Sequence, residues 1–80
     1  MNIQRAVALR LSAILREKNM TRYALCRKIA MNESTIYNII NEKCKGINLN
    51  TLYLICDGLD MSVIEFLDND LFKKENLEID

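Results

Sequence analysis

The residues that usually perform catalysis or bind metals are almost absent from this sequence. It contains no histidine, so the commonest general base and the commonest metal ligand are both missing. Its three cysteines, Cys26, Cys44 and Cys56, lie 18 and 12 residues apart with no CxxC pair, and an odd number cannot pair fully in disulfides. We interpret them as reduced thiols that pack as small hydrophobic residues. The sequence therefore argues against an enzyme and against a metal or cofactor site.

Hydrogen-bonding side chains gather instead between residues 33 and 41. Ile36, Ile39 and Ile40 recur at helical spacing and form one apolar stripe. At about 100° per residue, the polar side chains of this segment point away from that stripe: Glu33, Ser34, Tyr37, Asn38 and Asn41. Such carboxylate, hydroxyl and amide groups can bind a partner through hydrogen bonds, or they can simply be solvated.

Apolar residues at helical spacing predict five helices, and no stretch shows the sustained alternation of a strand. The helices are expected over residues 3–18, 22–29, 33–41 and 49–58, followed by a short fifth helix that carries Ile64 and Leu67 inward. The first four each follow a residue that can cap them: Asn2, Thr21, Asn32 and Asn48. Ser62 and Glu65 have the spacing of a capping box. The prediction is an all-α fold with short connections.

The charges divide along the chain although the formal net charge is zero. Residues 1–46 carry nine basic side chains against three acidic ones, and residues 57–80 carry eight acidic against two basic. Such a division is typical of a chain whose first half faces a polyanion. It is equally compatible with two solvated faces that attract each other.

The length of 80 residues supports one small domain. No apolar run approaches the roughly 18 residues that a membrane span needs, and the N-terminus leads into no signal-type apolar block. We therefore expect a cytoplasmic protein without a membrane partner. No small-molecule ligand or effector pocket is evident.

Two segments together resemble a known family. Residues 20–26, Met-Thr-Arg-Tyr-Ala-Leu-Cys, and residues 32–39, Asn-Glu-Ser-Thr-Ile-Tyr-Asn-Ile, are similar to the helix-turn-helix of the lambda Cro and repressor type, also called the xenobiotic response element family. The similarity continues without a gap through residues 49–59 and 61–67, so it covers about residues 5–67. It implies a compact five-helix, lambda-repressor-like DNA-binding domain over residues 1–68, with the helix-turn-helix at helices two and three. Residues 69–80 are then an acidic C-terminal tail, which we expect to be frayed.

The sequence departs from the family pattern at three places. Ala30 occupies the turn position that usually holds Gly, and Glu42 stands where the family often has Gly. Leu15 and Ile40 occupy two positions at which many members pair an Arg with a Glu. Replacing both partners of a buried ion pair by packed aliphatic residues is often neutral or stabilising, so this double change agrees with the resemblance.

The resemblance implies that the helix over residues 33–41 lies in the major groove of double-stranded DNA. The expected base contacts come from Glu33, Ser34, Tyr37 and Asn38. Asn38 can pair with the N6 and N7 atoms of adenine, and Glu33 can accept from the N4 amine of cytosine. The expected phosphate contacts come from exposed helix ends and from the loop after residue 41: Thr21, Arg22, Asn32, Asn41, Lys43 and Lys45.

The implied function is a sequence-specific, DNA-binding transcriptional regulator that acts as a homodimer on a palindromic operator. Ile47, Leu49 and Met61 match positions that pack between subunits in relatives, although they can equally belong to the core. The alternative is a protein-interaction module, such as the small partner of a larger regulator or toxin, which keeps the fold without specific DNA binding. The absence of Lys and Arg from the outward face favours that alternative, and the tail offers residues that could dock on such a partner: Leu71, Phe72, Leu77 and Ile79.

Overall fold

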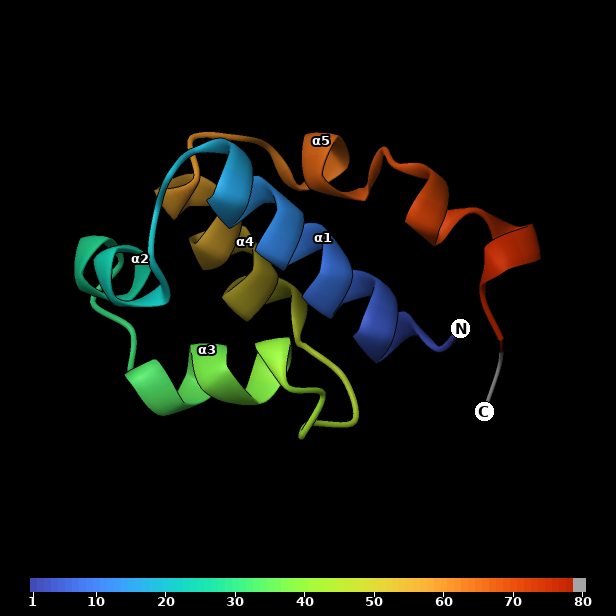
Figure 1. Cartoon of the computed structure of the whole chain (residues 1–80), viewed down its shortest axis with the longest axis horizontal. Helices are drawn as coiled ribbons and strands as arrows, with labels where there is room; N and C mark the ends of the chain where they lie inside the picture. The colour runs from blue at the N-terminus through green and yellow to red at the C-terminus, as the bar shows by residue number, and fades with distance from the viewer. Residues whose placement is uncertain (79–80) are drawn as a thin grey trace.

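The computed structural model describes residues 1–78, and Ile79 lies outside the described residues. Five α-helices run in the order α1 (Ile3–Glu17), α2 (Arg22–Lys28), α3 (Glu33–Ile40), α4 (Leu49–Gly58) and α5 (Val63–Leu67). Two 3-10 turns follow, η1 (Asp70–Phe72) and η2 (Lys74–Asn76) (Figure 1). No strand occurs in residues 1–78. The predicted all-α, five-helix fold is confirmed, and the four helices with predicted bounds each end within one residue of the observed ones. The expectation that Ile64 and Leu67 of the fifth helix face inward is wrong: they are 81% and 37% exposed, and Phe66 is the buried residue of α5.

Every α-helix begins at a side chain that satisfies a free backbone N–H of its first turn. The four expected caps accept hydrogen bonds from Arg5 N, Ala24 N, Ser34 N and Thr51 N at 2.8–3.2 Å: Asn2, Thr21, Asn32 and Asn48. At α5, Ser62 Oγ accepts from Glu65 N and Glu65 Oε1 accepts from Ser62 N, each at 3.0 Å, which is the predicted capping box. Each cap is worth about 1 kcal/mol, and such local signals explain why the helix starts are predictable.

The first four helices end in one common motif although none of them has Gly at the critical position. The residue after each C-cap has a left-handed backbone with φ of 51–58°: Asn19, Ala30, Glu42 and Asp60. In each case its N–H and the next N–H donate back to the last turn, for example Ala30 N to Arg27 O at 3.4 Å and Met31 N to Cys26 O at 2.9 Å. This is the Schellman arrangement, which Gly normally supplies without strain. Ala30 and Glu42 therefore adopt the left-handed conformation and carry its strain.

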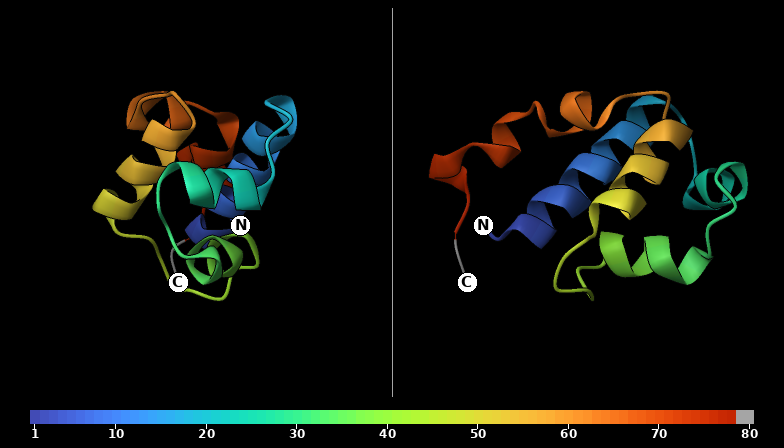
Figure 2. Two further views of the ribbon diagram at one scale, coloured as in Figure 1. Left: turned by 90° about the vertical axis from the view of Figure 1, so that its left-hand side faces the viewer. Right: turned by 180° about the vertical axis from the view of Figure 1, so that it is seen from behind.

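The core lies between the helices, with α1 packed on α3 and α4 packed on α2 and α5 (Figures 1 and 2). Leu11, Leu25, Ile36, Leu59 and Phe66 are fully buried in it. Leu15 is buried and Ile40 packs against the same cluster. The two positions that form an ion pair in many family members are therefore occupied here by aliphatic side chains that pack in the core. Cys26 and Cys56 are buried as expected, and burial raises the pKa of both thiols.

Helix α4 packs tightly at Gly58 against side chains of α2 and its C-cap. A Cβ atom at this position would lie 2.9 Å from Leu25 Cδ1 and nearer still to the side chain of Ile29. Gly58 does not have a positive φ. The absence of a side chain therefore serves packing, and it lets α4 support the helix that precedes the turn into α3.

The segment after α5 is ordered against the helices, in contrast to the predicted frayed terminus. The ring of Phe72 packs at 6.1 Å from that of Phe66, and the N-terminal amine of Met1 donates to Asn76 O at 2.9 Å. Glu78 N donates in turn to Met1 O at 2.8 Å, which brings the first and last described residues side by side. Leu71 and Leu77 are half-buried. The sequence missed this packing because one aromatic residue in a polar segment gives no periodic signal.

Candidate nucleic-acid interface

Helix α3 has one buried and one exposed face, as the isoleucine spacing predicts. Ile36 is 0% exposed and Ile39 is 6% exposed, while Ile40 is half-buried. The four candidate base-contacting residues are all exposed: Glu33, Ser34, Tyr37 and Asn38. The helix lies along one edge of the molecule with α2 at its start (Figures 1 and 2). Its polar face is therefore accessible to a macromolecule.

Some polar side chains around α3 already form hydrogen bonds within the protein, and others do not. Asn32 Oδ1 accepts hydrogen bonds from Ser34 N at 3.2 Å and from Ser34 Oγ at 3.1 Å. Asn41 Nδ2 donates to Tyr37 O at 2.9 Å, which closes the last turn of the helix. The side-chain amide of Asn38 makes no hydrogen bond to any residue in 1–78. Asn38 therefore offers a complete donor and acceptor pair to solvent or to a ligand.

Two basic residues flank the exposed face of α3 through a shared aromatic ring. The guanidinium of Arg22 lies 5.4 Å from the ring centroid of Tyr37, and Lys43 Nζ lies 5.3 Å from it. Arg22 is the first residue of α2 and Lys43 lies in the loop after α3. The ring therefore contacts one cation that precedes α3 in the sequence and one that follows it. Arg22, Glu33, Ser34 and Tyr37 also line one surface hollow. Candidate phosphate and base contacts are thus neighbours in space.

The loop over residues 41–48 is held to the first turns of α1. Arg5 Nη1 lies 3.4 Å from Glu42 Oε2 in an ion pair, and Gln4 Nε2 donates to Lys45 O. Sequence reasoning did not single out Gln4 or Arg5, because their partners lie 41 and 37 residues away along the chain. These two contacts define the path of the backbone that carries Lys43 and Lys45, both of which are exposed.

The remaining candidate residues lie at the start of α2, in the loop before α4, at the start of α4 and in the loop before α5. Thr21 and Arg22 are exposed at the start of α2, and the Thr21 hydroxyl is engaged as the helix cap. Of the three residues with two open interpretations, Ile47 and Met61 pack against the core, whereas Leu49 is 74% exposed.

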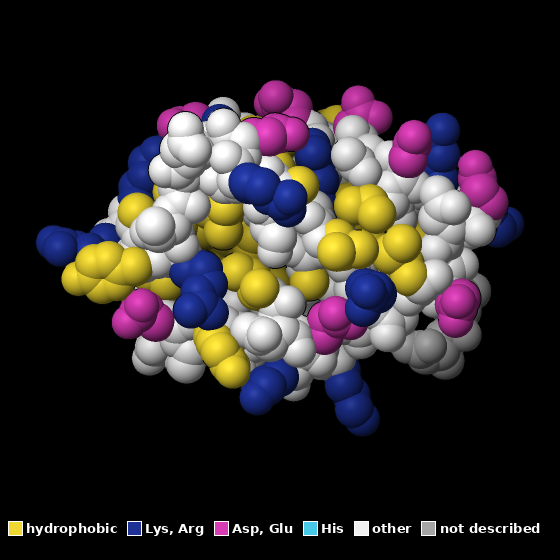
Figure 3. Space-filling model, viewed as in Figure 1, with side chains coloured by type: hydrophobic (Ala, Val, Ile, Leu, Met, Phe, Trp, Pro, Cys, Tyr) yellow, Lys and Arg dark blue, Asp and Glu magenta, His cyan; other side chains and the backbone are white. Residues whose placement is uncertain are grey.

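The two signs of charge are unevenly distributed over the surface. In Figure 3, acidic side chains predominate along the edge formed by α5 and the 3-10 turns, where some basic ones also lie, and basic side chains project from the opposite edge, below α3 and its loop. The exposed Glu33 and Glu42 add negative charge to α3 and its loop.

Two other basic residues are engaged elsewhere in the fold. Lys28 Nζ pairs with Asp60 Oδ2 at 3.1 Å, and Arg10 donates to Phe66 O at 2.8 Å and Glu65 O at 3.0 Å, which closes the end of α5. Arg10 was missed as a structural residue because its partners lie more than 50 positions away.

Within residues 1–78, no group of three or more potential metal-ligating side chains clusters in the fold. None of the helices there is long and apolar enough to cross a membrane.

The arrangement of α2, a tight turn and an exposed α3 on a five-helix core defines a helix-turn-helix domain. Comparison with known families gives the same result, because residues 10–69 match the model of the Cro/C1-type HTH DNA-binding domain. The chain belongs to this family, whose members bind DNA and are typically not enzymes. No curated protein and no solved structure matched the chain.

Proposed function

We propose that this protein is a sequence-specific transcriptional regulator that inserts α3 into the major groove of its operator. The observation that carries the proposal is the exposed polar face of α3, which is set on a buried isoleucine seam and flanked by Arg22 and Lys43. A recognition helix requires this division, because its inner face must hold it rigidly while its outer face meets base edges.

Base discrimination is assigned to the first two turns of α3. Asn38 has an unengaged amide, and such a group forms a bidentate pair with adenine N6 and N7. Ser34 can exchange its hydrogen bond with Asn32 for one to a base edge, because its hydroxyl rotates freely. Glu33 accepts from cytosine N4, and Tyr37 packs against a thymine methyl group or a phosphate. With no Lys or Arg on this face, we expect the preferred site to be read mainly through adenine, thymine and cytosine edges.

Affinity is assigned to residues around this face. Arg22, Lys43 and Lys45 supply positive charge, and the polar side chains at the ends of α2 and α3 supply hydrogen bonds to phosphate: Thr21, Asn32 and Asn41. Tyr37 holds Arg22 and Lys43 beside the groove-facing residues, so phosphate contacts fix the register in which the bases are read. The acidic edge over α5 and the 3-10 turns then faces away from the DNA (Figure 3).

Dimerisation is assigned to exposed apolar residues of α4 and α5. Leu49 is 74% exposed, Tyr53 58% and Ile64 81%, all on elements that do not carry the candidate DNA contacts. One α3 reads only a few base pairs, and a symmetric pair of subunits places two such helices about 34 Å apart on a palindrome. A homodimer therefore supplies the specificity that one short helix lacks.

Selection of bound duplexes from a random pool, followed by a salt titration, tests the proposal. We expect a palindromic consensus whose binding exceeds that of random duplex by about 10³ or more. Binding should also fall steeply between about 50 and 200 mM salt. Equal and weak binding to every duplex would contradict the proposal and favour the protein-interaction module instead.

A further inference from the structure

Negative charge gathers at the end of helix α3. Its last turn contains no basic residue, and Glu42 follows the C-cap, Asn41. The free carbonyl groups at the C-terminus of a helix carry a partial negative charge, and this carboxylate adds to it. Glu42 also lies between Asn41 and Lys43, two of the candidate phosphate contacts. A free carboxylate here would repel the phosphate backbone and compete with it for the lysine.

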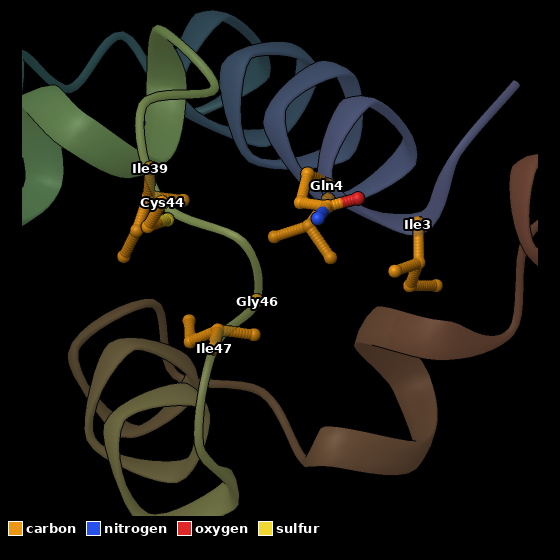
Figure 4. A pocket seen from close by; sticks show the side chains of 7 residues that line it. Ile3, Gln4, Ile39, Cys44, Gly46 and Ile47 are labelled. Atoms are coloured by element: carbon orange, nitrogen blue, oxygen red, sulfur yellow. The ribbon is translucent and has the colours of Figure 1, made fainter. Parts of the chain in front are cut away.

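The backbone of Glu42 is fixed at the end of α3. Glu42 has a φ of 58°, and its N–H donates to Ile39 O at 3.2 Å. Lys43 N donates to Asn38 O at 2.8 Å, which completes the turn. The loop that continues from this turn runs beside the first turn of α1, near Gln4 (Figure 4). The Glu42 side chain therefore starts from a fixed point within reach of α1.

One cation on α1 holds this carboxylate. Arg5 Nη1 lies 3.4 Å from Glu42 Oε2, and the two side chains are 57% and 35% exposed. No other ion pair in residues 1–78 joins α1 to α3 or to the loop after it. Arg5 also precedes residues 10–69, which match the family model, so the match to the family does not account for this contact.

We infer that Arg5 is a positioning residue for DNA binding, which holds the carboxylate of Glu42 against α1 and away from phosphate. This inference rests on the proposed function, because the phosphate contacts of Asn41, Lys43 and Lys45 are part of it. The ion pair is exposed, so its contribution to folding stability is small. Its effect arises in the complex, where a released carboxylate would repel the DNA backbone and pair with Lys43. Arg5 acts through Glu42 and makes no phosphate contact of its own.

Anisotropy titrations of four proteins with the selected operator test this role: the parent, Arg5→Gln, Glu42→Gln and the double variant. Arg5→Gln should weaken binding about threefold to fivefold, because exposed ion pairs couple by up to about fivefold in an equilibrium constant. Glu42→Gln should bind at least as tightly as the parent, since it has no carboxylate to hold. In the Glu42→Gln background, the loss of Arg5 should cost less than about twofold.

Arg16→Gln is the matched control. Arg16 is exposed in the last turn of α1 and forms no ion pair within residues 1–78, so its loss removes the same charge without releasing Glu42. It should weaken binding by less than about twofold, because salt screens a distant charge. Without DNA, the backbone amide signals of residues 41–45 should shift in the ¹⁵N NMR spectrum of Arg5→Gln and stay in place in that of Arg16→Gln. Thermal unfolding checks that each variant is folded, and Arg5→Ala replaces Arg5→Gln if the latter is not.

Two results would overturn the inference and leave the proposed function intact, because the parent still prefers its operator in both. An equal cost of Arg5→Gln with and without Glu42 would show that Arg5 contacts phosphate directly. An equal cost of Arg5→Gln and Arg16→Gln would show that only the net charge matters. A parent that binds every duplex equally and weakly would overturn the proposed function, and the role of Arg5 with it.

Discussion

The guanidinium of Arg22, the first residue of α2, lies 5.4 Å from the ring centroid of Tyr37 in the middle of α3. Lys43 reaches the same ring from the loop after α3, at 5.3 Å. One aromatic side chain on the candidate recognition helix thus positions cations that precede and follow that helix in the chain. The ring links the residues assigned to bases with those assigned to phosphate.

The aromatic ring of Tyr37, and not its hydroxyl group, should hold Arg22 and Lys43 in place for DNA binding. Each exposed cation–π contact is worth about 0.5–1 kcal/mol and holds its cation in place before DNA binds, so Tyr37→Ala should weaken binding to all duplexes by at most about 1–2 kcal/mol. Tyr37→Phe keeps the ring and should retain most of the affinity. Fluorescence anisotropy with the selected operator measures both. Equal losses of affinity in the two variants would show that Tyr37 contributes through a hydrogen bond from its hydroxyl group to a base or a phosphate.

Relief of the left-handed strain at Ala30 should stabilise the fold. Ala30 has φ of 52° at the end of α2, where Gly carries no Cβ penalty. We expect Ala30→Gly to raise the free energy of unfolding by about 0.5–1 kcal/mol. The matched control is Ala24→Gly, an exposed position inside α2 that should lose about 0.5–1 kcal/mol. Urea denaturation gives both values, and a loss of stability in both variants would contradict the Schellman assignment.

A methyl group at Gly58 should destabilise the protein, which is opposite to the usual effect in a helix. The new Cβ would lie 2.9 Å from Leu25 Cδ1, and overpacking of this kind costs about 1–3 kcal/mol. Gly46→Ala is the control, because a Cβ there meets nothing within 4 Å and should change stability by less than about 1 kcal/mol. Thermal unfolding distinguishes the two. A stabilised Gly58→Ala would mean that α2 and α4 are not this close.

The capping box of α5 should make stability depend on pH. Hydrogen bonds from the backbone and side chain of Ser62 lower the pKa of Glu65 below its ordinary value of 4.5. A carboxyl group whose pKa is lower in the folded state stabilises above its unfolded pKa, and this contribution is lost as the pH falls through the folded value. Glu65→Gln should therefore be less stable than the parent at neutral pH, and the gap should close below pH 4. A gap that is constant between pH 7 and 3 would exclude this role.

The sequence predicted the local features of this fold closely. The caps at Asn2, Thr21, Asn32 and Asn48 act within three residues of themselves, and the isoleucine stripe of α3 is a local periodicity. The all-α architecture follows from these signals, and the family resemblance carried by residues 20–26 and 32–39 is confirmed by the match to the family model. The assignment of individual side chains to bases and phosphates stays a prediction.

Contacts between segments that are distant in the chain could not be predicted from the sequence. The bond from Gln4 to the Lys45 carbonyl, the role of Arg10 at the end of α5 and the packing of Phe72 on Phe66 all depend on tertiary geometry. None of them produces a pattern within one helical turn, which is the range over which spacing is informative. A small apolar hollow between the start of α1, the end of α3 and the loop after it was missed for the same reason, because each of these segments supplies part of its wall (Figure 4).

The most direct test of the proposed function compares Asn38→Ala with Lys43→Ala on the selected operator and on all its single-base variants. Asn38→Ala should cost about 1–3 kcal/mol and relax the preference at one base position. Lys43→Ala should weaken every sequence alike and reduce the salt slope by about 1. If the two variants behave indistinguishably across the set, the exposed face of α3 does not read the bases.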